Sequence, residues 1–270
     1  MKICLVNASQ WIEGFHDAWF NMLQNNFRKV LRPDTEVAMK SLKAGLKGDN
    51  AFDFANAYFN LLNKRELVEV IIEAEKERFD AAVVMVGDDT GVKEARAVVN
   101  IPVIGPGEAS MLLACQLGRK FGTIVANLPD TGLIATIEEQ IKLHGLQDRV
   151  IANPVRYDVH AFTDTWEKGF QDPKFAADGV VEGTKSLVAD GADVAVVLCC
   201  GIGPFCTAAG LSKVKIGSKY IPVLDATAVA AKTAEMAVDL RKGLGLPFTS
   251  VPLPTEQDMH RVRPLFGLPT

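Results

Sequence analysis

The stretch Val194-Ala195-Val196-Val197-Leu198-Cys199-Cys200-Gly201-Ile202-Gly203-Pro204 is the most informative part of the chain. It joins an apolar, β-branched run to two adjacent thiols and a glycine-rich turn. The run predicts a buried strand of a parallel sheet, and the turn predicts the start of the next helix. Backbone amides at the start of a helix stabilise a thiolate and bind anions. We therefore predict a catalytic cysteine at this strand end.

A weaker copy of the same pattern lies earlier in the chain. The run from Asp80 to Gly87 parallels the run from Asp193 to Cys200, and each is followed by a polar or glycine-rich turn. In this register Gly87 is equivalent to Cys200, and Val86 is equivalent to Cys199. The repeat predicts two similar lobes that face each other, of which only one carries sulfur.

Apolar runs and segments of helical periodicity alternate along most of the chain, which is typical of parallel sheets covered on both faces. We predict an α/β fold of two Rossmann-like lobes with four-stranded parallel sheets, related by a pseudo-twofold axis. The predicted division places residues 1–105 and 226–270 in the first lobe and residues 106–225 in the second. Parallel sheets bind ligands at the carboxyl ends of their strands, so the active site is expected in the cleft between the lobes.

Composition excludes several classes of partner. The 270 residues carry a formal net charge of −4, and their Lys and Arg are scattered, so a nucleic-acid partner is not expected. No stretch approaches the ~18 apolar residues that a membrane span needs, and the opening apolar run is too short for a signal peptide. We expect a cytoplasmic protein with no membrane partner, whose partner is a small carboxylate or ureide substrate. A homo-oligomer is one option for its assembly.

The five cysteines fit a reducing compartment, where disulfides are not expected. Cys199 and Cys200 lack the two-residue spacer of a zinc knuckle, and only four histidines are available, so no metal is predicted. Because side chains alternate along a strand, at most one of the two adjacent thiols should face the cleft. We favour Cys200 and keep Cys199 as the alternative. Core packing is the competing explanation for either thiol.

Further candidates lie at the ends of the predicted strands. The turn after Val86 offers Asp89 as a possible base and Gly87, Asp88 and Thr90 as possible substrate contacts, although either aspartate could simply cap the following helix. The amides of Gly201 and Ile202 would stabilise a developing oxyanion from the opposite side. The remaining predicted substrate contacts follow other strands or their loops: Asn7, Ser9, Gln10, Trp11, Asn127 and His160. The aromatic run that includes Trp11 could instead be the core face of the first helix, and His160 could be a surface residue.

Several of these segments together resemble the aspartate/glutamate/hydantoin racemase superfamily. The resemblance rests on the runs Val103–Met111 and Leu117–Val125, on the turn Asp89-Thr90-Gly91 leading to Glu94-Ala95-Arg96, on the opening strand ending in Asn7, and on Pro222-Val223-Leu224-Asp225 entering an alanine-rich helix. It implies an enzyme without a cofactor, in which two cysteines, one from each lobe, flank a carbon acid. One thiolate removes a proton, and the opposing thiol returns a proton to the other face.

This chain departs from that pattern at the first cysteine. Its position maps to Val86 or Gly87, and neither side chain can move a proton, whereas the second cysteine maps to Cys200. The single cysteine resembles arylmalonate decarboxylase more than hydantoin racemase, which favours a decarboxylase or lyase that protonates a carbanion. One alternative is a hydantoin or amino-acid racemase that uses Asp88 or Asp89 as its second base. Another is a non-catalytic protein that binds small anions.

Overall fold

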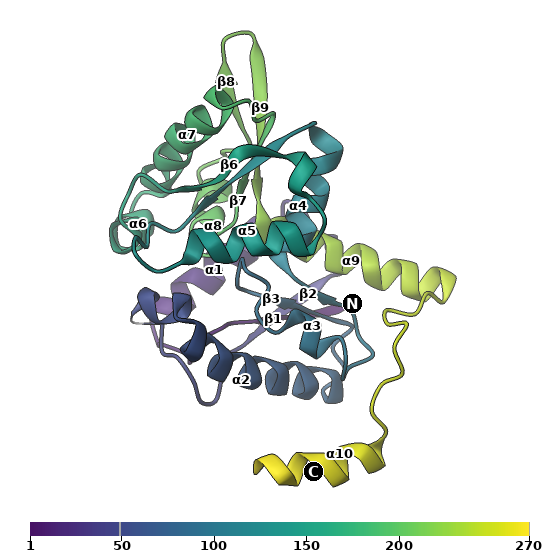
Figure 1. The fold of residues 1–270 in the computed structure, drawn as a ribbon. Coiled ribbons are helices and arrows are strands. Elements are labelled where there is room, and N and C mark those ends of the chain that lie inside the picture. Colours follow the sequence, from purple (N-terminus) through teal and green to yellow (C-terminus); the bar gives the residue numbers. More distant parts are fainter. Residues whose placement is uncertain (49, 270) are drawn as a thin grey trace.

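The computed structural model describes residues 1–48 and 50–269, and it contains two sheets (Figure 1). The first sheet has four parallel strands in the order β2-β1-β3-β4. Their bounds are β1 (Lys2–Val6), β2 (Glu36–Lys40), β3 (Ala81–Val84) and β4 (Val103–Ile104). This sheet has the predicted number and direction of strands.

The second sheet has five strands in the order β6-β5-β7-β9-β8. These are β5 (Phe121–Val125), β6 (Val150–Tyr157), β7 (Val194–Val197), β8 (Lys213–Ile216) and β9 (Lys219–Asp225). The first four in this order are parallel, as predicted, but β8 is an antiparallel edge strand that sequence analysis missed. In β8 lysine alternates with an apolar residue over only four positions, which is a weak strand signal. The strand also depends on the tight turn to β9, in which Gly217 has a positive φ of 59°.

Helices cover both sheets. The first lobe carries α1 (Phe15–Phe27), the 3₁₀ helix η1 (Ala51–Ala55), α2 (Ala57–Lys76) and α3 (Val92–Ala95). The second sheet is accompanied by α4 (Pro106–Leu117), α5 (Leu133–Leu143), η2 (Gln147–Arg149), α6 (Phe162–Gly169), α7 (Pro173–Ala189) and α8 (Gly203–Ala208). The chain ends with α9 (Ala226–Leu244), α10 (Glu256–Val262) and η3 (Arg263–Phe266). None of the helices in the described ranges is both long and apolar enough to cross a bilayer.

Side chains of the first sheet alternate between two cores. Ile3, Leu5 and Val83 pack with α1 and α9, whereas Cys4 and Val84 belong to the core beneath α2. Because both faces are buried, the strands read as continuous apolar runs rather than as an alternating pattern. Burial on both faces therefore explains why the strands of this sheet are visible in the sequence.

The two sheets have corresponding strand orders. In the first sheet β3 lies between β1 and β4. In the second sheet β7 lies at the equivalent place, between β5 and β9. The turn after β3 contains Val86 and Gly87, and the turn after β7 contains Cys199 and Cys200. The correspondence predicted from the sequence repeat thus matches the order of the strands.

Helix α9 begins directly at the end of β9 and packs across the first sheet. Ala230, Ala234 and Val238 join the core that contains Ile3 and Leu5. In Figure 1 this helix lies between the two sheets and leads into a tail that places α10 below α2. The bidentate ion pair of Arg263 with Glu69 attaches this tail to α2, at 2.9 and 2.6 Å. We keep the division at residues 105/106 and 225/226 as a proposal.

Candidate active site

A cavity of about 970 Å³ opens between the carboxyl ends of the two sheets. Its walls come from both halves of the chain, including the turns after β1, β3, β5 and β7, helices α1 and α6, and the segment from η1 into α2. This is the location predicted for parallel sheets. Nine of the predicted site residues line it: Asn7, Ser9, Gly87, Asp88, Asp89, Thr90, Cys199, Cys200 and Gly201.

The turns after β3 and β7 meet at very short range. A Cβ atom built on Gly87 would lie 2.3 Å from the carbonyl oxygen of Leu198 and 3.2 Å from the Cγ atom of the same residue. Only glycine permits this approach without movement of the backbone. Gly87 therefore brings the first-lobe turn directly against the strand end that carries Cys199 and Cys200.

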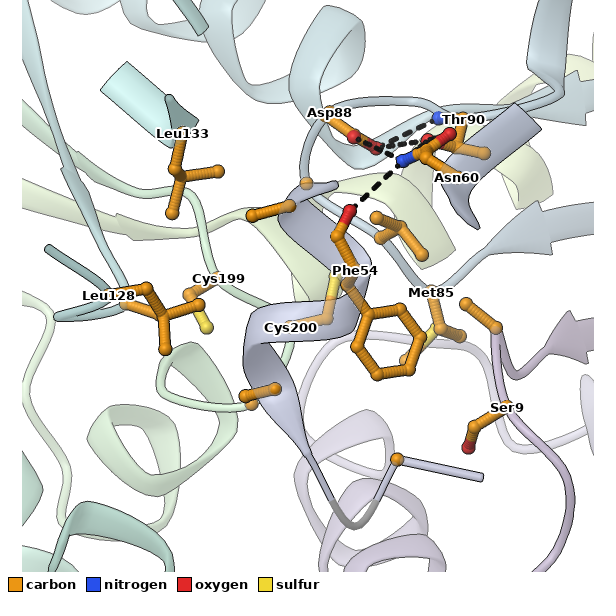
Figure 2. Close-up of a pocket in the computed structure, with 18 of the residues that line it drawn as sticks. Ser9, Phe54, Asn60, Met85, Asp88, Thr90, Leu128, Leu133, Cys199 and Cys200 are labelled. Atoms are coloured by element: carbon orange, nitrogen blue, oxygen red, sulfur yellow. Dashed lines mark hydrogen bonds between the residues drawn. The ribbon is translucent and has the colours of Figure 1, made fainter. Parts of the chain in front are cut away.

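Both Cys199 and Cys200 line the cavity, which differs from the expectation that at most one would do so. The physical reason is that β7 ends at Val197, so the alternation of side chains along a strand no longer applies to the two thiols. Cys199 is half-buried and lies near Leu128, whereas Cys200 is buried and lies nearer to Met85 (Figure 2).

Burial controls the protonation of both thiols. It raises the pKa of Cys199 to about 11, although the backbone amides of Gly201 and Ile202 act in the opposite direction. Burial also raises the pKa of Cys200 well above its ordinary value, and the nearby carboxylates of Asp225 and Asp89 raise it further. Both groups are therefore thiols rather than thiolates at neutral pH.

Two backbone amides of the glycine-rich turn are already used in hydrogen bonds within the turn. The amides of Ile202 and Gly203 donate to the carbonyl oxygen of Cys199, at 3.0 and 2.9 Å. Ile202 itself is fully buried in the core of the second sheet and does not line the cavity. Of the two amides predicted to face a developing oxyanion, that of Gly201 is therefore the better placed.

Asp88 is held within its own turn. Its Oδ1 atom accepts hydrogen bonds from the Thr90 amide at 3.0 Å and from the Thr90 hydroxyl at 2.7 Å. Asn60 of α2 completes the group through its side-chain amide, which donates to Asp88 Oδ2 and to Thr90 Oγ1 (Figure 2). Sequence analysis missed Asn60, because it lies on a different element 28 residues earlier.

Asp89 caps a helix of the opposite half of the chain. Its carboxylate accepts hydrogen bonds from the amides of Gly107 and Glu108, at 2.8 and 2.7 Å, at the start of α4. Burial raises the pKa of Asp89 to about 7, against the stabilising effect of these two amides. A Cβ atom on Gly105 would lie 2.3 Å from the Asp89 carboxyl carbon, so glycine is needed there for the carboxylate to fit.

Asn7, Ser9 and His16 form a polar group at one end of the cavity. The Nδ1 atom of His16 accepts a hydrogen bond from the Ile12 amide at 2.7 Å, and Nε2 lies 3.2 Å from Ser9 Oγ. Burial lowers the pKa of His16, so the ring is neutral near pH 7 and its proton is on Nε2. The Asn7 side-chain amide donates to Ser9 Oγ at 3.0 Å. His16 was not predicted, because it lies within the helical aromatic pattern of α1.

Known proteins resemble this chain in sequence. The sequence profile of the family described as Asp/Glu/Hydantoin racemase matches residues 50–234. The chain belongs to this racemase family. It is 28% identical over 243 residues to a hydantoin racemase from Pseudomonas sp. (strain NS671), which covers 90% of this chain and 88% of that relative.

Two solved allantoin racemases share the fold of this family member. The enzyme from Klebsiella pneumoniae superposes with a TM-score of 0.70 at 19% identity, over 95% of this chain and 94% of the other. The enzyme from Pseudomonas fluorescens gives a TM-score of 0.70 at 22% identity, over 95% of this chain and 99% of the other. The two-lobed α/β architecture is thus the fold of these racemases.

Aromatic side chains form much of the cavity wall in this racemase-family protein. Phe15 and Trp19 come from α1, Phe162 and Trp166 from α6, and Phe54 from η1. Phe15 stacks on Trp166 with ring centroids 4.6 Å apart, and Trp19 lies 5.9 Å from Trp166. The helical spacing of Phe15 and Trp19 was visible in the sequence, but α6 carried no signal that it would face them.

Four other predicted contacts lie away from the cavity wall. Gln10 donates its side-chain amide to the carbonyl oxygen of Gly45, at 2.7 Å. Trp11 is 40% exposed and packs against His16 from outside the cavity. His160 stacks on Phe175, with ring centroids 4.0 Å apart, and Asn127 is half-buried beside the cavity residues Ala126 and Leu128.

Metal-ligand groups are not brought together in the described parts of the chain. Across residues 1–48 and 50–269, no three side chains of His, Cys, Asp or Glu are placed to hold an ion together. The polar groups of the cavity are hydroxyl, amide, imidazole, thiol, carboxylate and ammonium groups. These can bind acceptor or donor atoms of a small acid and exchange protons with it.

Proposed function

We propose that this protein is a cofactor-independent enzyme that protonates a carbanion next to a carboxylate or carbonyl group, with Cys200 as the proton donor. The observation that carries the proposal is the asymmetry of the two equivalent turns. One holds Cys199 and Cys200, and the other holds Val86 and Gly87, neither of which carries a proton. A substrate between them meets a thiol on one face only.

The protonation state of Cys200 supports the role of a donor. A base must be a thiolate in the resting enzyme, but the raised pKa of Cys200 keeps it a thiol. In a decarboxylation, the bond between the α-carbon and a carboxylate breaks, CO₂ leaves, and the electron pair stays on the α-carbon as an enediolate. The S–H bond of Cys200 then breaks as a C–H bond forms, and water returns a proton to the thiolate.

The polar group at Asn7, Ser9 and His16 fits the acceptor atoms of the substrate. His16 Nε2 donates its proton to Ser9 Oγ, so the Ser9 hydroxyl hydrogen, which is directed at the Gln10 carbonyl oxygen, is the group that can turn to a carboxylate or ureide oxygen. The amide of Gly201 lies beside Cys200, where it can stabilise a developing oxyanion. Removing one such donor typically raises a barrier by ~3 to 4 kcal/mol.

The aromatic wall indicates the kind of substituent that the substrate carries. Phe15, Phe162 and Trp166 offer ring faces and edges, and the cavity volume of about 970 Å³ is large for a small amino acid. We infer a substrate with a bulky apolar or aryl group next to the reacting carbon. Small acidic substrates would leave this wall uncovered.

A second candidate is a racemase that acts on 5-substituted hydantoins. It is favoured by the 28% identity to a hydantoin racemase over most of both chains, and by the carboxylate of Asp88 at the cavity. Asp88 would have to act as the second base. Its hydrogen bonds from Thr90 and Asn60 hold it within the turn.

Proton NMR in D₂O separates these activities. The protein is incubated with 2-aryl-2-methylmalonate, other 2-substituted malonates, 5-benzylhydantoin and free amino acids, and each product is examined for CO₂ loss and for deuterium at the α-carbon. We expect CO₂ release with one deuteron added to a single face. Exchange of the α-proton without loss of mass would establish the racemase instead.

Cysteine variants complete the test. Cys200→Ala should abolish turnover, whereas Cys206→Ala is a matched control, because Cys206 is also buried but does not line the cavity. Full activity of Cys200→Ala together with loss of activity in Cys199→Ala would move the donor role to Cys199. Binding of these compounds without turnover of any of them would contradict both enzymatic proposals and favour a binding protein.

A further inference from the structure

The 3₁₀ helix η1 contacts the cores of both lobes. Ala51 packs against the core of the second sheet that contains Ile124 and Leu128, and Phe54 packs against the core beneath α2. No residue of η1 is buried, so these apolar contacts hold it only weakly. Because Ala51 and Phe54 both line the cavity, the hydrogen bonds of η1 matter for the shape of the cavity wall.

Asn60 of α2 supplies a hydrogen bond that ties η1 to the rest of the site. Its side-chain amide donates to the Phe54 carbonyl oxygen at 3.2 Å (Figure 2). Among the described residues, the other hydrogen bonds made by residues 51–55 stay within the segment 50–56. The bond from Asn60 is therefore the one that fixes η1 relative to the first-lobe side of the cavity.

The same amide nitrogen has two further acceptors, both in the turn after β3. It lies 3.1 Å from Thr90 Oγ1 and 3.3 Å from Asp88 Oδ2. A carbonyl and a carboxylate only accept hydrogen bonds, so the nitrogen of the Asn60 amide, and not its oxygen, must face Phe54 and Asp88. The Thr90 hydroxyl lies closer to Asp88 Oδ1, at 2.7 Å, than to Asn60 Oδ1, at 3.2 Å, so it donates to Asp88 and accepts from Asn60.

Three acceptors thus compete for the hydrogens of one amide group. A side-chain amide carries only two N–H hydrogens. The three distances, from 3.1 to 3.3 Å, lie at the long end of the range for N–H···O bonds, as expected when hydrogens are shared. A group that donates to Asp88 Oδ2 or Thr90 Oγ1 in place of Asn60 leaves an amide hydrogen for the Phe54 carbonyl oxygen. The turn and η1 are connected through this amide.

We propose that Asn60 is a positioning residue that couples the state of the turn at Asp88 and Thr90 to the seating of η1 at the cavity wall. The inference rests on the proposed function only in taking this cavity as the substrate site. A substrate donor bound at the turn releases an amide hydrogen of Asn60 to the Phe54 carbonyl oxygen, which seats η1 more firmly. By thermodynamic reciprocity, a firmly seated η1 favours occupancy of the turn.

Hydrogen–deuterium exchange of η1 tests this coupling in the protein without ligand. The exchange rate of the backbone amides of residues 51–56 is measured by mass spectrometry in wild-type protein and in two nearly isosteric variants. Asn60→Leu removes both amide hydrogens, so exchange should be about fivefold faster, as for loss of a typical hydrogen bond. Should Asn60→Leu fail to fold, Asn60→Ala removes the same hydrogens.

Thr90→Val should have the opposite effect on η1. It removes one of the three competing acceptors, while the Thr90 amide still holds Asp88 Oδ1 at 3.0 Å. Two acceptors then share two hydrogens, so exchange in residues 51–56 should be slower than in wild type by about twofold, as for a bond that is partly gained. General loosening of the site by either substitution would instead speed exchange in both variants.

The double variant and a matched control complete the test. Exchange in Asn60→Leu/Thr90→Val should equal that in Asn60→Leu alone, because Thr90 acts on η1 only through the amide. Asn25→Leu, at an exposed position of α1, is the control and should leave exchange of η1 unchanged. Unchanged exchange in Asn60→Leu, exchange in Thr90→Val at or above the wild-type rate, or additive effects in the double variant would each overturn the proposal.

Turnover separates this inference from the proposed function. If the protein decarboxylates 2-aryl-2-methylmalonate, Asn60→Leu should raise KM more than it lowers kcat, because the amide acts on η1 and not on Cys200. If no compound is turned over but the exchange contrast is present, the proposed function fails while the coupling stands. If turnover is seen without the exchange contrast, only the role of Asn60 fails.

Discussion

Gly87 and Leu198 hold the two halves of the site in contact. The Cα atom of Gly87 faces the carbonyl oxygen of Leu198 so closely that an added Cβ atom would lie only 2.3 Å from it. Leu198 directly precedes Cys199 and Cys200, so the separation of the two turns is set at this contact. A cysteine at position 87 could not be accommodated without moving the backbone that carries the thiols.

Gly87→Ala should therefore destabilise the protein and disturb the site. Because the obstacle is backbone rather than a flexible side chain, we expect a loss of ~1 to 3 kcal/mol in the free energy of unfolding, as for overpacked cores. Urea denaturation measures this loss. Val86→Ala is the control, since it removes atoms from the same turn instead of adding them. If Gly87→Ala proved as stable as wild type, the close approach of Gly87 to the Leu198 carbonyl would not exist in solution.

Val86→Cys should introduce a second proton carrier facing the cavity. Val86 lines the cavity in the turn equivalent to that of the two thiols, and its side chain already has the space that a thiol needs. We expect the variant to gain exchange of the α-proton of aryl-substituted acids in D₂O, detected by NMR. Pairing Val86→Cys with Cys200→Ala should remove the gained exchange, and its persistence in that double variant would show that Cys200 is not the partner.

Gly201→Ala should impair activity through the aromatic wall. A Cβ atom on Gly201 would lie 2.7 Å from Cζ2 and 2.8 Å from Nε1 of Trp166, whose ring is packed against Phe15 and Phe205. The ring would have to move toward the cavity, so we expect KM for an aryl substrate to rise by about tenfold or more, as for a loss of 1.4 kcal/mol in binding. Steady-state kinetics measure this, and Gly243→Ala controls for general effects, because this glycine lies in α9 with open space around an added Cβ atom and has no positive φ.

Asp89 should make stability fall as pH rises. Burial raises the folded-state pKa of Asp89 from an ordinary value of 3.8 to about 7, so the unfolded chain ionises this group before the folded protein does. The favourable contribution of the protonated group is complete below about pH 4 and is lost as pH rises through 7. The unfolding free energy of wild-type protein minus that of Asp89→Asn should accordingly decrease from pH 4.5 to pH 8.

Urea denaturation of both proteins at pH 4.5, 6 and 8 provides the test of Asp89. Asp88 and Glu108 also raise the pKa of Asp89, so a Glu108→Gln variant should reduce the pH dependence without removing it. A difference between wild-type and Asp89→Asn proteins that increases with pH would contradict the assignment.

The sequence was sufficient to predict the two-lobed fold because its strands are buried on both faces. Runs such as Ala81–Val84 and Val194–Val197 contain no polar residue, and the helices between them follow the period of 3.6. The strand β8 was missed because it lies at an edge and half of its side chains are lysine. Edge strands satisfy weaker sequence constraints than central ones.

The site was predictable where it lies at strand ends and unpredictable where it depends on contacts between helices. Asn7, Asp88 and Cys200 follow strands directly, so their convergence follows from the sheet. Asn60 and Trp166 reach the cavity only because α2 and α6 pack in particular orientations. Asp89 illustrates a third case, in which the residue was identified but its carboxylate is occupied by the amides that begin α4.

The continuous passage from β9 into α9 has a consequence for how substrate reaches the cavity. Asp225 ends a strand of one sheet and caps the helix that covers the other, so no flexible hinge lies at this crossing. Asn26 adds a buried hydrogen bond from α1 to the Pro204 carbonyl oxygen, at 2.8 Å. We expect admission of substrate to depend on displacement of η1, whose Phe54 lines the cavity and which has no fully buried residue, rather than on rotation of the lobes.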